Sequence, residues 1–547
     1  MFKLRNILWM GALTLACVSC SDDYMNTPPS DLLPLEAFYK TPKQIDQGVV
    51  GLYSDMQMLD YNGYLLMSEY RSDNIWVDPS PDGLREYSEI GTFRATWNLS
   101  TFNDTWNLLY KTIYDANVLL SRIDNVTFSS EDAKKQFKGE ALFMRGWSYL
   151  ELARFFGNVP IINKPVTTEE SKQIGQSTAR EVFDQMVIPD LTEAINLLPY
   201  KKKLVDGNGA TVAGSGRADK VAAQAMLART YMTLAGYPFN DTAAKASAKT
   251  LLKEILDYSA ANGNAYWAPN ITEWKKQWMP SSDYYNKYTI FAIQHRLNEK
   301  KNYVIFNATP ELAPSQTSVR LMGNSVWVEK TLAYEYEKNN HQDLRGLGFG
   351  TLEEQAAEKN YAGYANEKGT FTDEDGQTHE VYQKTICLKL VPTKPKLAAL
   401  GITFDDSQVG SNYYDWPTNY PVLRLEDMML LYAELLAEDG DYTGAMSYVN
   451  KIRERAGMDQ PTANSKEEAM KYIKRERRLE LVDEGVRWFD EIRYGEWKED
   501  TKAMFDRYNN PDGTNVDNIK NYLYPIPQNQ YNAVHQGLYK QNDGYSY

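Results

Sequence analysis

Apolar residues recur at helical spacing in two separate blocks of the chain. The first block contains four long segments of this kind, at residues 103–123, 133–156, 178–198 and 218–235. The second block contains three, at residues 425–438, 442–456 and 466–493. The pair Asp439-Gly440 predicts a tight turn between the first two helices of the second block. We therefore expect a chain built mainly from α-helices.

The segment 133–156 predicts a helix that is buried on more than one side. Phe143, Trp147 and Leu150 share one helical face, while Tyr149 and other apolar residues occupy another. A helix that is apolar on several faces is usually packed between neighbouring helices. We expect it to end at Gly157, with a proline three residues further on.

The remaining organisation is predicted from how these segments are spaced. Helix pairs of about 34 residues are the unit of tetratricopeptide repeats, although no strict repeat aligns here. We predict a mainly α fold with a right-handed, tetratricopeptide-like scaffold, mainly at 36–260 and 421–500. The stretch from about 262 to 420 lacks sustained helical periodicity and contains short β-like runs at 288–294 and 380–390. Long irregular segments on a rigid scaffold are often functional, so we expect a loop-rich, ligand-facing insertion in a single domain, 36–547.

The first residues predict a targeting signal. Lys3 and Arg5 precede a short apolar run at 7–18, which is the layout of a secretory signal, and the run is shorter than a membrane-spanning helix requires. The run ends in Ser19-Cys20, which resembles a lipoprotein processing site. We expect a signal peptide at 1–19, lipidation of Cys20 and a tether at 20–35, where polar residues are followed by Pro28 and Pro29. Cys17 is the alternative acceptor, and an ordinary cleaved signal is the alternative to lipidation.

Charge and cysteine content exclude some classes of protein. The formal net charge of −14 and the lack of a basic stripe disfavour a nucleic-acid partner. Two of the three cysteines lie in the targeting segment, so the mature chain has no disulfide framework. The 39 Tyr and 12 Trp supply amphipathic rings, which suit helix packing, carbohydrate faces and protein interfaces alike.

The charged residues of the second block favour structure over catalysis. Glu476 and Glu480 are four residues apart and are interleaved with arginines, a spacing that suits ion pairs within and between helices. We expect the same locking role for Arg145, Arg453, Arg455 and Arg487. The four histidines are scattered, no Gly-x-Ser-x-Gly elbow is present, and Asp373 to Gly376 suits a solvated hairpin turn better than a calcium loop. We therefore expect no catalytic residues, no metal and no cofactor.

Five ordered motifs resemble one family, the SusD/RagB outer-membrane lipoproteins of glycan- and peptide-uptake systems. The motifs are Glu140-Ala-Leu-Phe-Met-Arg145-Gly-Trp followed by Phe155-Phe-Gly-Asn-Val-Pro160, then Gly216-Arg-Ala-Asp-Lys-Val-Ala-Ala, then Leu423-Arg-Leu-Glu-Asp-Met-Met with Asn450-Lys-Ile-Arg-Glu-Arg-Ala-Gly457, then Glu476-Arg-Arg-Leu-Glu through Arg493-Tyr-Gly, and Tyr524-Pro-Ile-Pro527 with Gln541-Asn-Asp-Gly-Tyr545. Between residues 262 and 420 the chain carries no matching motif.

This resemblance implies a function at the cell surface. Members are helical, with tetratricopeptide-like pairs and an irregular ligand-facing half, and sit as a lid over a TonB-dependent, SusC-like β-barrel transporter. The resemblance implies a lipid-anchored outer-membrane protein that binds an oligosaccharide or polysaccharide and delivers it to that transporter. A peptide-binding lid, a tetratricopeptide-like protein adaptor and a surface glycosidase are the alternatives, the last disfavoured by the charge pattern.

A glycan site combines aromatic platforms with amide, carboxylate and guanidinium hydrogen-bonding groups. Three loops have this chemistry, and the family resemblance places a ligand-binding loop after the first helix. The candidates are Asp60, Asn62, Tyr64, Arg71, Asp73, Asn74, Trp76 and Trp97 in the first region, Trp327 in the middle region, and Tyr414 and Trp416 in the third. For each tryptophan, packing in the core is the competing expectation. Arg71 and Asp73 are also candidates for a local ion pair that orders the loop.

Overall fold

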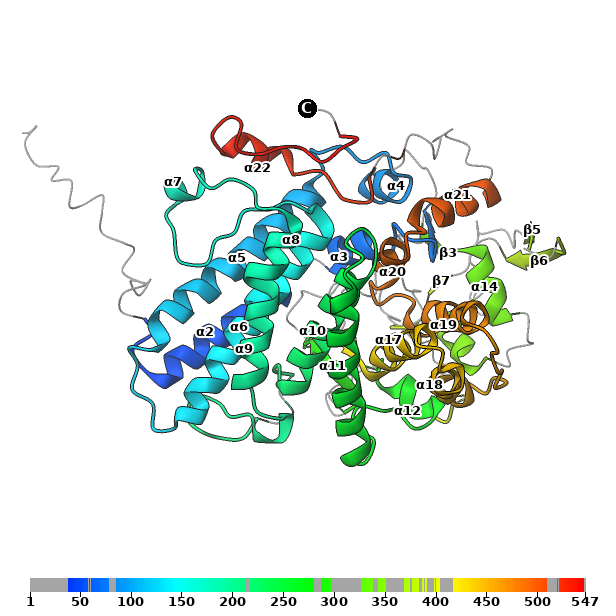
Figure 1. Ribbon diagram of the computed structural model, residues 1–547, viewed down its shortest axis with the longest axis horizontal. Helices are drawn as coiled ribbons and strands as arrows, with labels where there is room; N and C mark the ends of the chain where they lie inside the picture. Colours follow the sequence, from blue (N-terminus) through cyan, green and yellow to red (C-terminus); the bar gives the residue numbers. More distant parts are fainter. Residues whose placement is uncertain are drawn as a thin grey trace, which may run out of the picture.

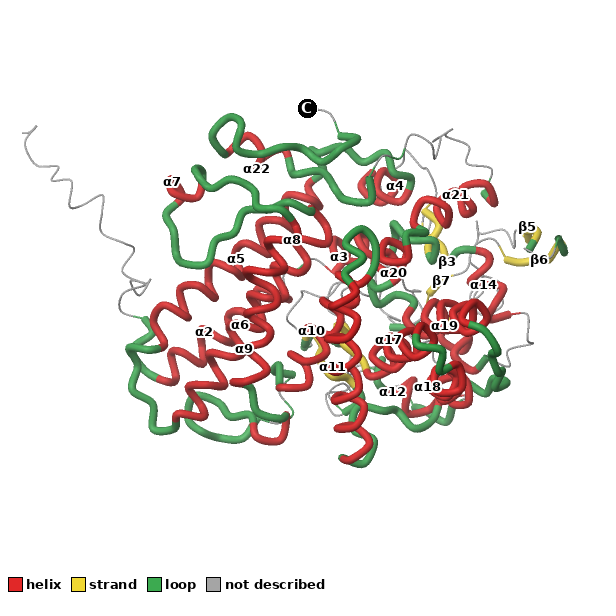
Figure 2. The backbone as a smooth tube through the Cα atoms, viewed as in Figure 1, coloured by secondary structure: helices red, strands yellow, loops and turns green. Residues whose placement is uncertain are grey.

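The computed structural model describes most of residues 38–545. Its gaps are at 58, 60, 78–84, 213, 215, 280–286, 297–325, 338–342, 351–367, 374–375, 383–385, 388, 391–397, 399, 404–416, 509–518 and 520. The described part is mainly helical, as predicted, and the helices form a row of packed neighbours (Figure 2). None of the helices in the described part of the chain combines the length and the apolar character that a membrane span needs.

The N-terminal block supplies the first half of this row. Its helices are α2 (Pro42–Gln57), α3 (Tyr61–Ser68), α4 (Arg85–Gly91), α5 (Ser100–Ile123), α6 (Glu131–Phe156), α7 (Thr168–Ser171), α8 (Ala179–Val182), α9 (Ile188–Leu197), α10 (Lys220–Ala235) and α11 (Thr242–Ala261), with a π-helical turn η1 (Phe183–Val187) and a 3-10 turn η2 (Lys201–Lys203). α2 packs on α5, α5 on α6, α6 on α9, α9 on α10 and α10 on α11 (Figure 1).

Local chemistry fixes the ends of these helices. Ser130 caps α6 by accepting a hydrogen bond from the backbone N–H of Ala133. The helix ends at Gly157, where φ is +71°, a left-handed backbone value that favours glycine. The predicted helix at 178–198 is present, but it passes through the π-helical turn η1 before Pro189 in α9. Proline lacks the N–H that a regular turn would use, which accounts for this local change of pitch.

The C-terminal block continues the row. Its helices are α17 (Leu425–Glu438), α18 (Tyr442–Arg455), α19 (Lys466–Leu481), α20 (Arg487–Tyr494), α21 (Trp497–Arg507) and α22 (Gln528–Ala533). α11 packs on α17, which contacts both α18 and α19 (Figure 1). The turn between α17 and α18 contains Gly440 at φ +85°, as the pair Asp439-Gly440 predicts.

The middle region contains short elements instead of long helices. They are α12 (Ile271–Lys276), α14 (Lys330–Glu337), the 3-10 turn η6 (Leu344–Gly348), and four antiparallel strand pairs: β1 (Ile75–Val77) with β3 (Val326–Val328), β2 (Thr289–Ile293) with β8 (Tyr420–Arg424), β4 (Phe349–Gly350) with β7 (Ile386–Cys387), and β5 (Lys368–Thr372) with β6 (Thr378–Tyr382). The predicted β-like run at 288–294 is confirmed as β2. The run at 380–390 contains the end of β6 and the short β7.

The hydrophobic core runs through both helical blocks. One cluster of buried side chains extends from Ile45 in α2 to Tyr539 near the C-terminus. Both predicted apolar faces of α6 belong to it, with Phe143, Leu150 and Tyr149 each fully buried. The prediction that this helix packs on several sides is therefore confirmed.

Candidate functional site

The segment 60–76 is predicted as a ligand-binding loop, but its described residues form α3, a turn and the start of β1, and residues 63–76 are buried. Asp60 and the side chain of Asn62 lie outside the described residues. Tyr64 is buried, and its hydroxyl donates a hydrogen bond to Glu151 at 3.3 Å. Because its ring packs edge-on against Phe155 and Tyr420, it has no free face for a sugar.

Arg71 lies in a box of aromatic rings and does not pair with Asp73. Its guanidinium carbon is 4.2 Å from the ring centre of Phe93, 5.2 Å from that of Trp488 and 4.4 Å from that of Tyr524. Stacking on ring faces stabilises a buried guanidinium without an adjacent carboxylate. The hypothesis of a local Arg71–Asp73 pair is therefore wrong, since arginines from distant helices neutralise Asp73.

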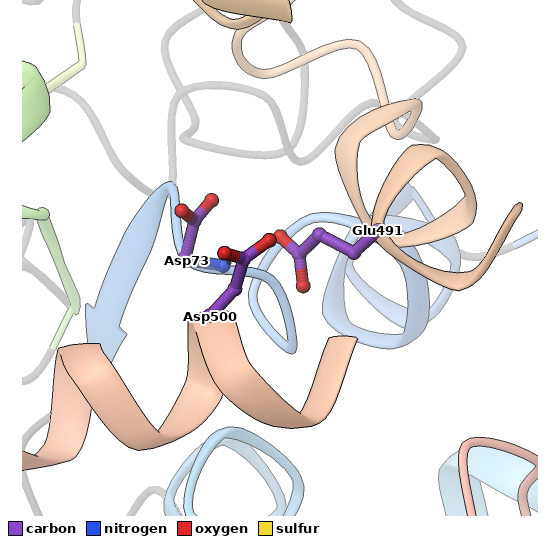
Figure 3. Close-up of side chains that lie close together, drawn as sticks. All are labelled: Asp73, Glu491 and Asp500. Atoms are coloured by element: carbon purple, nitrogen blue, oxygen red, sulfur yellow. Dashed lines mark hydrogen bonds between the residues drawn. The ribbon is translucent and has the colours of Figure 1, made fainter. Parts of the chain in front are cut away.

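Asp73 belongs to a carboxylate cluster that is shown in Figure 3. One oxygen each of Asp73, Glu491 and Asp500 lies within 4.8 Å of the others. Arg487 contacts all three, with Nε 2.7 Å from Asp73 and 3.1 Å from Glu491, and Nη2 3.2 Å from Asp500. This guanidinium already supplies the positive charge that a metal ion would bring, so we assign the cluster a structural role.

Asn74 and two of the four candidate tryptophans, Trp76 and Trp327, are likewise used in packing. Asn74 donates to Glu69 at 2.7 Å and accepts from Arg478 at 3.0 Å. Trp76 on β1 lies opposite Trp327 on β3, and its ring stacks on Tyr508 with centres 4.1 Å apart and planes 7° from parallel. Trp76 and Trp327 are 4% and 2% exposed, which removes them as surface platforms for a ligand. Cys20, Tyr414 and Trp416 lie outside the described residues.

The charged residues of the family-like motifs lock helices together, as predicted. Arg145 on α6 forms a two-point ion pair with Asp190 on α9, with both N–O distances 2.7 Å. Glu480 on α19 accepts from Arg455 at 2.7 Å and from Arg424 at 3.0 Å, and all three side chains are buried. Burial opposes ionisation of Glu480, but these guanidinium groups hold the pKa of its carboxyl below its ordinary value.

An open cleft with different chemistry lies beside α5, and we call it the α5 cleft. Its volume is about 610 Å³, within the usual range of ligand pockets, and its walls come from α5, from residues 160–172 and from residues 530–539. The lining residues are Trp106, Asn107, Tyr110, Ile113, Tyr114, Pro160, Ile162, Val166, Thr167, Thr168, Ser171, Lys172, Gln530, Ala533, Val534 and Tyr539.

One wall of the α5 cleft is formed by aromatic residues that recur every four residues along α5. Trp106, Tyr110 and Tyr114 are four residues apart, so their side chains lie along one face of the helix. Trp106 and Tyr110 pack together with ring centres 5.1 Å apart, and the Tyr110 hydroxyl donates to the carbonyl of Pro160 at 2.7 Å. Tyr114 is 41% exposed and provides a ring face at the surface. These residues form a rigid wall that ends in one accessible ring.

Amide groups lie beside this wall. The Gln530 Nε2 group donates to the Oδ1 atoms of Asn103 at 3.0 Å and Asn107 at 2.8 Å. Among the described residues, neither the Asn107 Nδ2 group nor the Gln530 Oε1 atom has a hydrogen-bond partner, so a donor and an acceptor remain for a ligand. The backbone N–H of His535 donates to the carbonyl of Lys172 at 3.1 Å, which ties two walls of the cleft together.

Trp97 is the one predicted aromatic candidate that is described and only partly buried. Its ring meets Tyr531 edge-on with centres 5.7 Å apart, and its carbonyl accepts from the backbone N–H of Gln528 at 3.0 Å. Because Tyr531 follows Gln530 directly, Trp97 lies close to one end of the α5 cleft. The cleft itself is not predicted from the sequence, although aromatic residues at four-residue spacing next to an asparagine are a usable signal for it.

A second, smaller pocket lacks this mixed character. Its volume is about 300 Å³ and its walls include Phe183, Phe239 and Phe489. The arginines that line it are already paired, for example Arg493 with Glu434 at 2.6 Å. The α5 cleft is therefore the better candidate for a polar ligand with apolar faces.

Comparisons with known proteins agree with this architecture. A family model described as "SusD family" matches residues 317–545, and one described as "Starch-binding associating with outer membrane" matches residues 23–232. SusD-like protein P38 of Formosa agariphila is 25% identical over 518 residues, which cover 90% of this chain and 92% of that protein.

The chain belongs to the SusD/RagB family. Its fold is also that of solved SusD-like structures. A SusD homologue from Bacteroides thetaiotaomicron superposes with a TM-score of 0.72 at 22% identity, covering 93% of this chain and 98% of the other. A laminarin-binding SusD-like protein superposes with a TM-score of 0.65 at 21% identity, covering 93% and 100%. The family resemblance seen in the five motifs is thus confirmed.

Proposed function

We propose that this protein is a non-enzymatic surface lipoprotein of the outer membrane that captures a glycan in the α5 cleft. It then delivers the glycan to a TonB-dependent, SusC-like β-barrel transporter. The observation that carries the proposal is the combination of an aromatic wall, an exposed Tyr114 ring and amide groups of Asn107 and Gln530 in one open cleft. Ring faces match the C–H faces of sugars, and the amides match their hydroxyl groups.

Family membership supports the same class of ligand. One matching family model is described as starch-binding, and a SusD-like protein of the same fold is described as laminarin-binding. Trp97 stays a candidate for an additional platform, because it is partly exposed next to Tyr531. Cys20 stays the proposed lipid attachment site.

Calorimetric titration of the protein lacking residues 1–20, against a panel of polysaccharides and peptides, tests the proposal. We expect binding to a glycan, and we expect Tyr114→Ala to weaken it roughly tenfold, equal to about 1.4 kcal/mol. Tyr200→Ala is the matched control, because Tyr200 is 37% exposed but lies outside the cleft, stacked on Tyr258. Glycan binding that is equally strong in both variants contradicts the α5 cleft as the site, and binding to peptides alone favours a peptide-binding lid.

The transporter partnership needs a separate test. We expect the tagged full-length protein to co-purify with a β-barrel of the outer membrane after gentle detergent extraction. Tyr114→Ala is expected to keep this association while it loses glycan affinity. Loss of the association together with glycan affinity indicates instead that the cleft contacts the transporter. Recovery of the glycan at unchanged length after long incubation with the pure protein is the expected result for a protein without hydrolase activity.

A further inference from the structure

We propose that the α5 cleft selects neutral glycans and rejects glycans that carry carboxylate or sulfate groups. This inference rests on the proposed function and adds the chemical class of the ligand. Among the described residues that line the cleft, Lys172 is the only one with a full charge at neutral pH. Every other lining side chain is an aromatic ring, an aliphatic group, a hydroxyl or an amide.

The one charged side chain is already paired. Lys172 Nζ lies 2.6 Å from Glu169 Oε1, three residues away at the end of α7. Lys111 on α5 does not line the cleft, and it is shared between Asp55 and Asp115. A ligand anion in the cleft must therefore compete with Glu169 for the one ammonium group among the described lining residues.

The described walls of the cleft do not contain the side chain best suited to anions, which is arginine. Arginine binds carboxylate and sulfate-like oxygens through two parallel hydrogen bonds, and sites for such ligands usually contain it. None of the described lining residues is an arginine. The overall charge of −14 adds a weak long-range repulsion of polyanions.

The remaining walls suit an uncharged sugar. Pro160, Ile162 and Val534 add apolar surface to the other two walls of the cleft, which suits the C–H faces of a pyranose ring. Asn107, Gln530 and the hydroxyl of Thr168 then provide donors and acceptors at the rim. Removing a carboxylate or sulfate from water into such a site has a cost that Lys172, already paired with Glu169, offsets only in part.

A matched pair of ligands tests the inference. The neutral polysaccharide that binds best in the panel is compared with its own sulfated derivative, which has the same backbone and linkage. We expect the neutral polymer to bind at least about tenfold more tightly, with little change as salt increases. Tighter binding of the sulfated derivative that weakens with salt overturns the inference while it leaves glycan capture intact. If no polymer of either kind binds, both the proposed function and this inference fail.

Adding a positive charge to the wall of the cleft gives a more specific test than the comparison of ligands. Val166→Arg places a guanidinium on the wall at 160–172, and we expect it to raise affinity for the sulfated polymer about fivefold or more. Val50→Arg on α2 is the control, because Val50 is 51% exposed and lies outside the cleft, so it adds the same charge elsewhere. An equal gain in both variants indicates a general charge effect, and no gain in either one contradicts binding of the polymer next to Val166.

Discussion

At the scale of single residues, the cluster of Asp73, Glu491 and Asp500 links stability to pH. Arg478 and Arg487 hold the pKa of Asp73 below its ordinary value, although burial opposes this. Burial and the neighbouring charge of Asp73 raise the pKa of Asp500 to about 6. The folded protein therefore keeps a proton on Asp500 at pH values where the unfolded chain has lost it.

The sign of the effect follows from this difference. A carboxyl group whose pKa is raised by folding lowers stability as pH rises from about 4 to about 6, because the unfolded state releases its proton first. We expect Asp500→Asn to remove this loss of stability. The free energy of unfolding of the variant minus that of the native protein is then expected to be higher at pH 7 than at pH 4, by up to about 3 kcal/mol. Urea unfolding at the two pH values measures the change.

Asp506→Asn is the control for that experiment, because Asp506 lies on the same helix α21 but is exposed and pairs only with Lys502 among the described residues. A pH-independent difference between Asp500→Asn and the native protein contradicts the assigned proton. Asp500→Asn also loses the 3.2 Å contact with Arg487, and this loss lowers the stability of the variant at every pH. Subtracting the stability differences at the two pH values cancels this constant contribution.

At the scale of elements, helix α19 is held in place by charge as much as by apolar packing. Glu480 accepts hydrogen bonds from Arg345, Arg424 and Arg455, and from the indole N–H of Trp274 at 2.9 Å. These partners come from four different elements or connections around α19. The helix therefore has one orientation in which all these groups are satisfied.

We expect Glu480→Gln to lower the free energy of unfolding by about 3–5 kcal/mol, because it leaves buried guanidinium groups without their shared carboxylate. Glu467→Gln is the control on the same helix, since Glu467 is exposed, and its effect is expected to stay within about 0.5 kcal/mol. Chemical unfolding followed by circular dichroism measures both. Similar stabilities for the two variants contradict a structural role for the network.

The elements differ in how far the sequence determines them. Long helices such as α5 and α6 are predicted correctly because their apolar residues recur at helical spacing, and α6 also carries a capping Ser130 at its start and Gly157 at its end. α3 and β1 are missed because tyrosine, asparagine and aspartate in 60–76 also suit a surface loop. Their burial depends on partners such as Trp327 and Arg487, which lie more than 200 residues away and have no local signal.

At the scale of the whole molecule, the α5 cleft is a product of the tertiary fold. Its walls come from α5, from the connection after α6 and from the C-terminal segment. The C-terminal segment is held over α6 by the backbone hydrogen bond from Tyr524 to the carbonyl of Phe155 at 2.8 Å, and by the Tyr524 hydroxyl, which donates to the carbonyl of Met67 at 2.7 Å. Sequence alone identifies aromatic and amide groups in each segment, but it does not show that they meet.

The proposed attachment to the membrane also belongs to this scale, because it depends on one thiol that lies outside the described residues. If Cys20 carries the lipid, Cys20→Ala is expected to abolish incorporation of labelled palmitate and to release the protein from the membrane fraction. Cys17→Ala is the matched control, since Cys17 is the alternative acceptor three residues earlier, and it is expected to keep both properties. Glycan affinity of the released Cys20→Ala protein is expected to equal that of the native protein, because the walls of the α5 cleft begin more than 80 residues further along the chain. Palmitate labelling that persists in Cys20→Ala but is lost in Cys17→Ala shows that Cys17 carries the lipid. If the native protein and both variants all remain unlabelled, the lipid anchor is excluded.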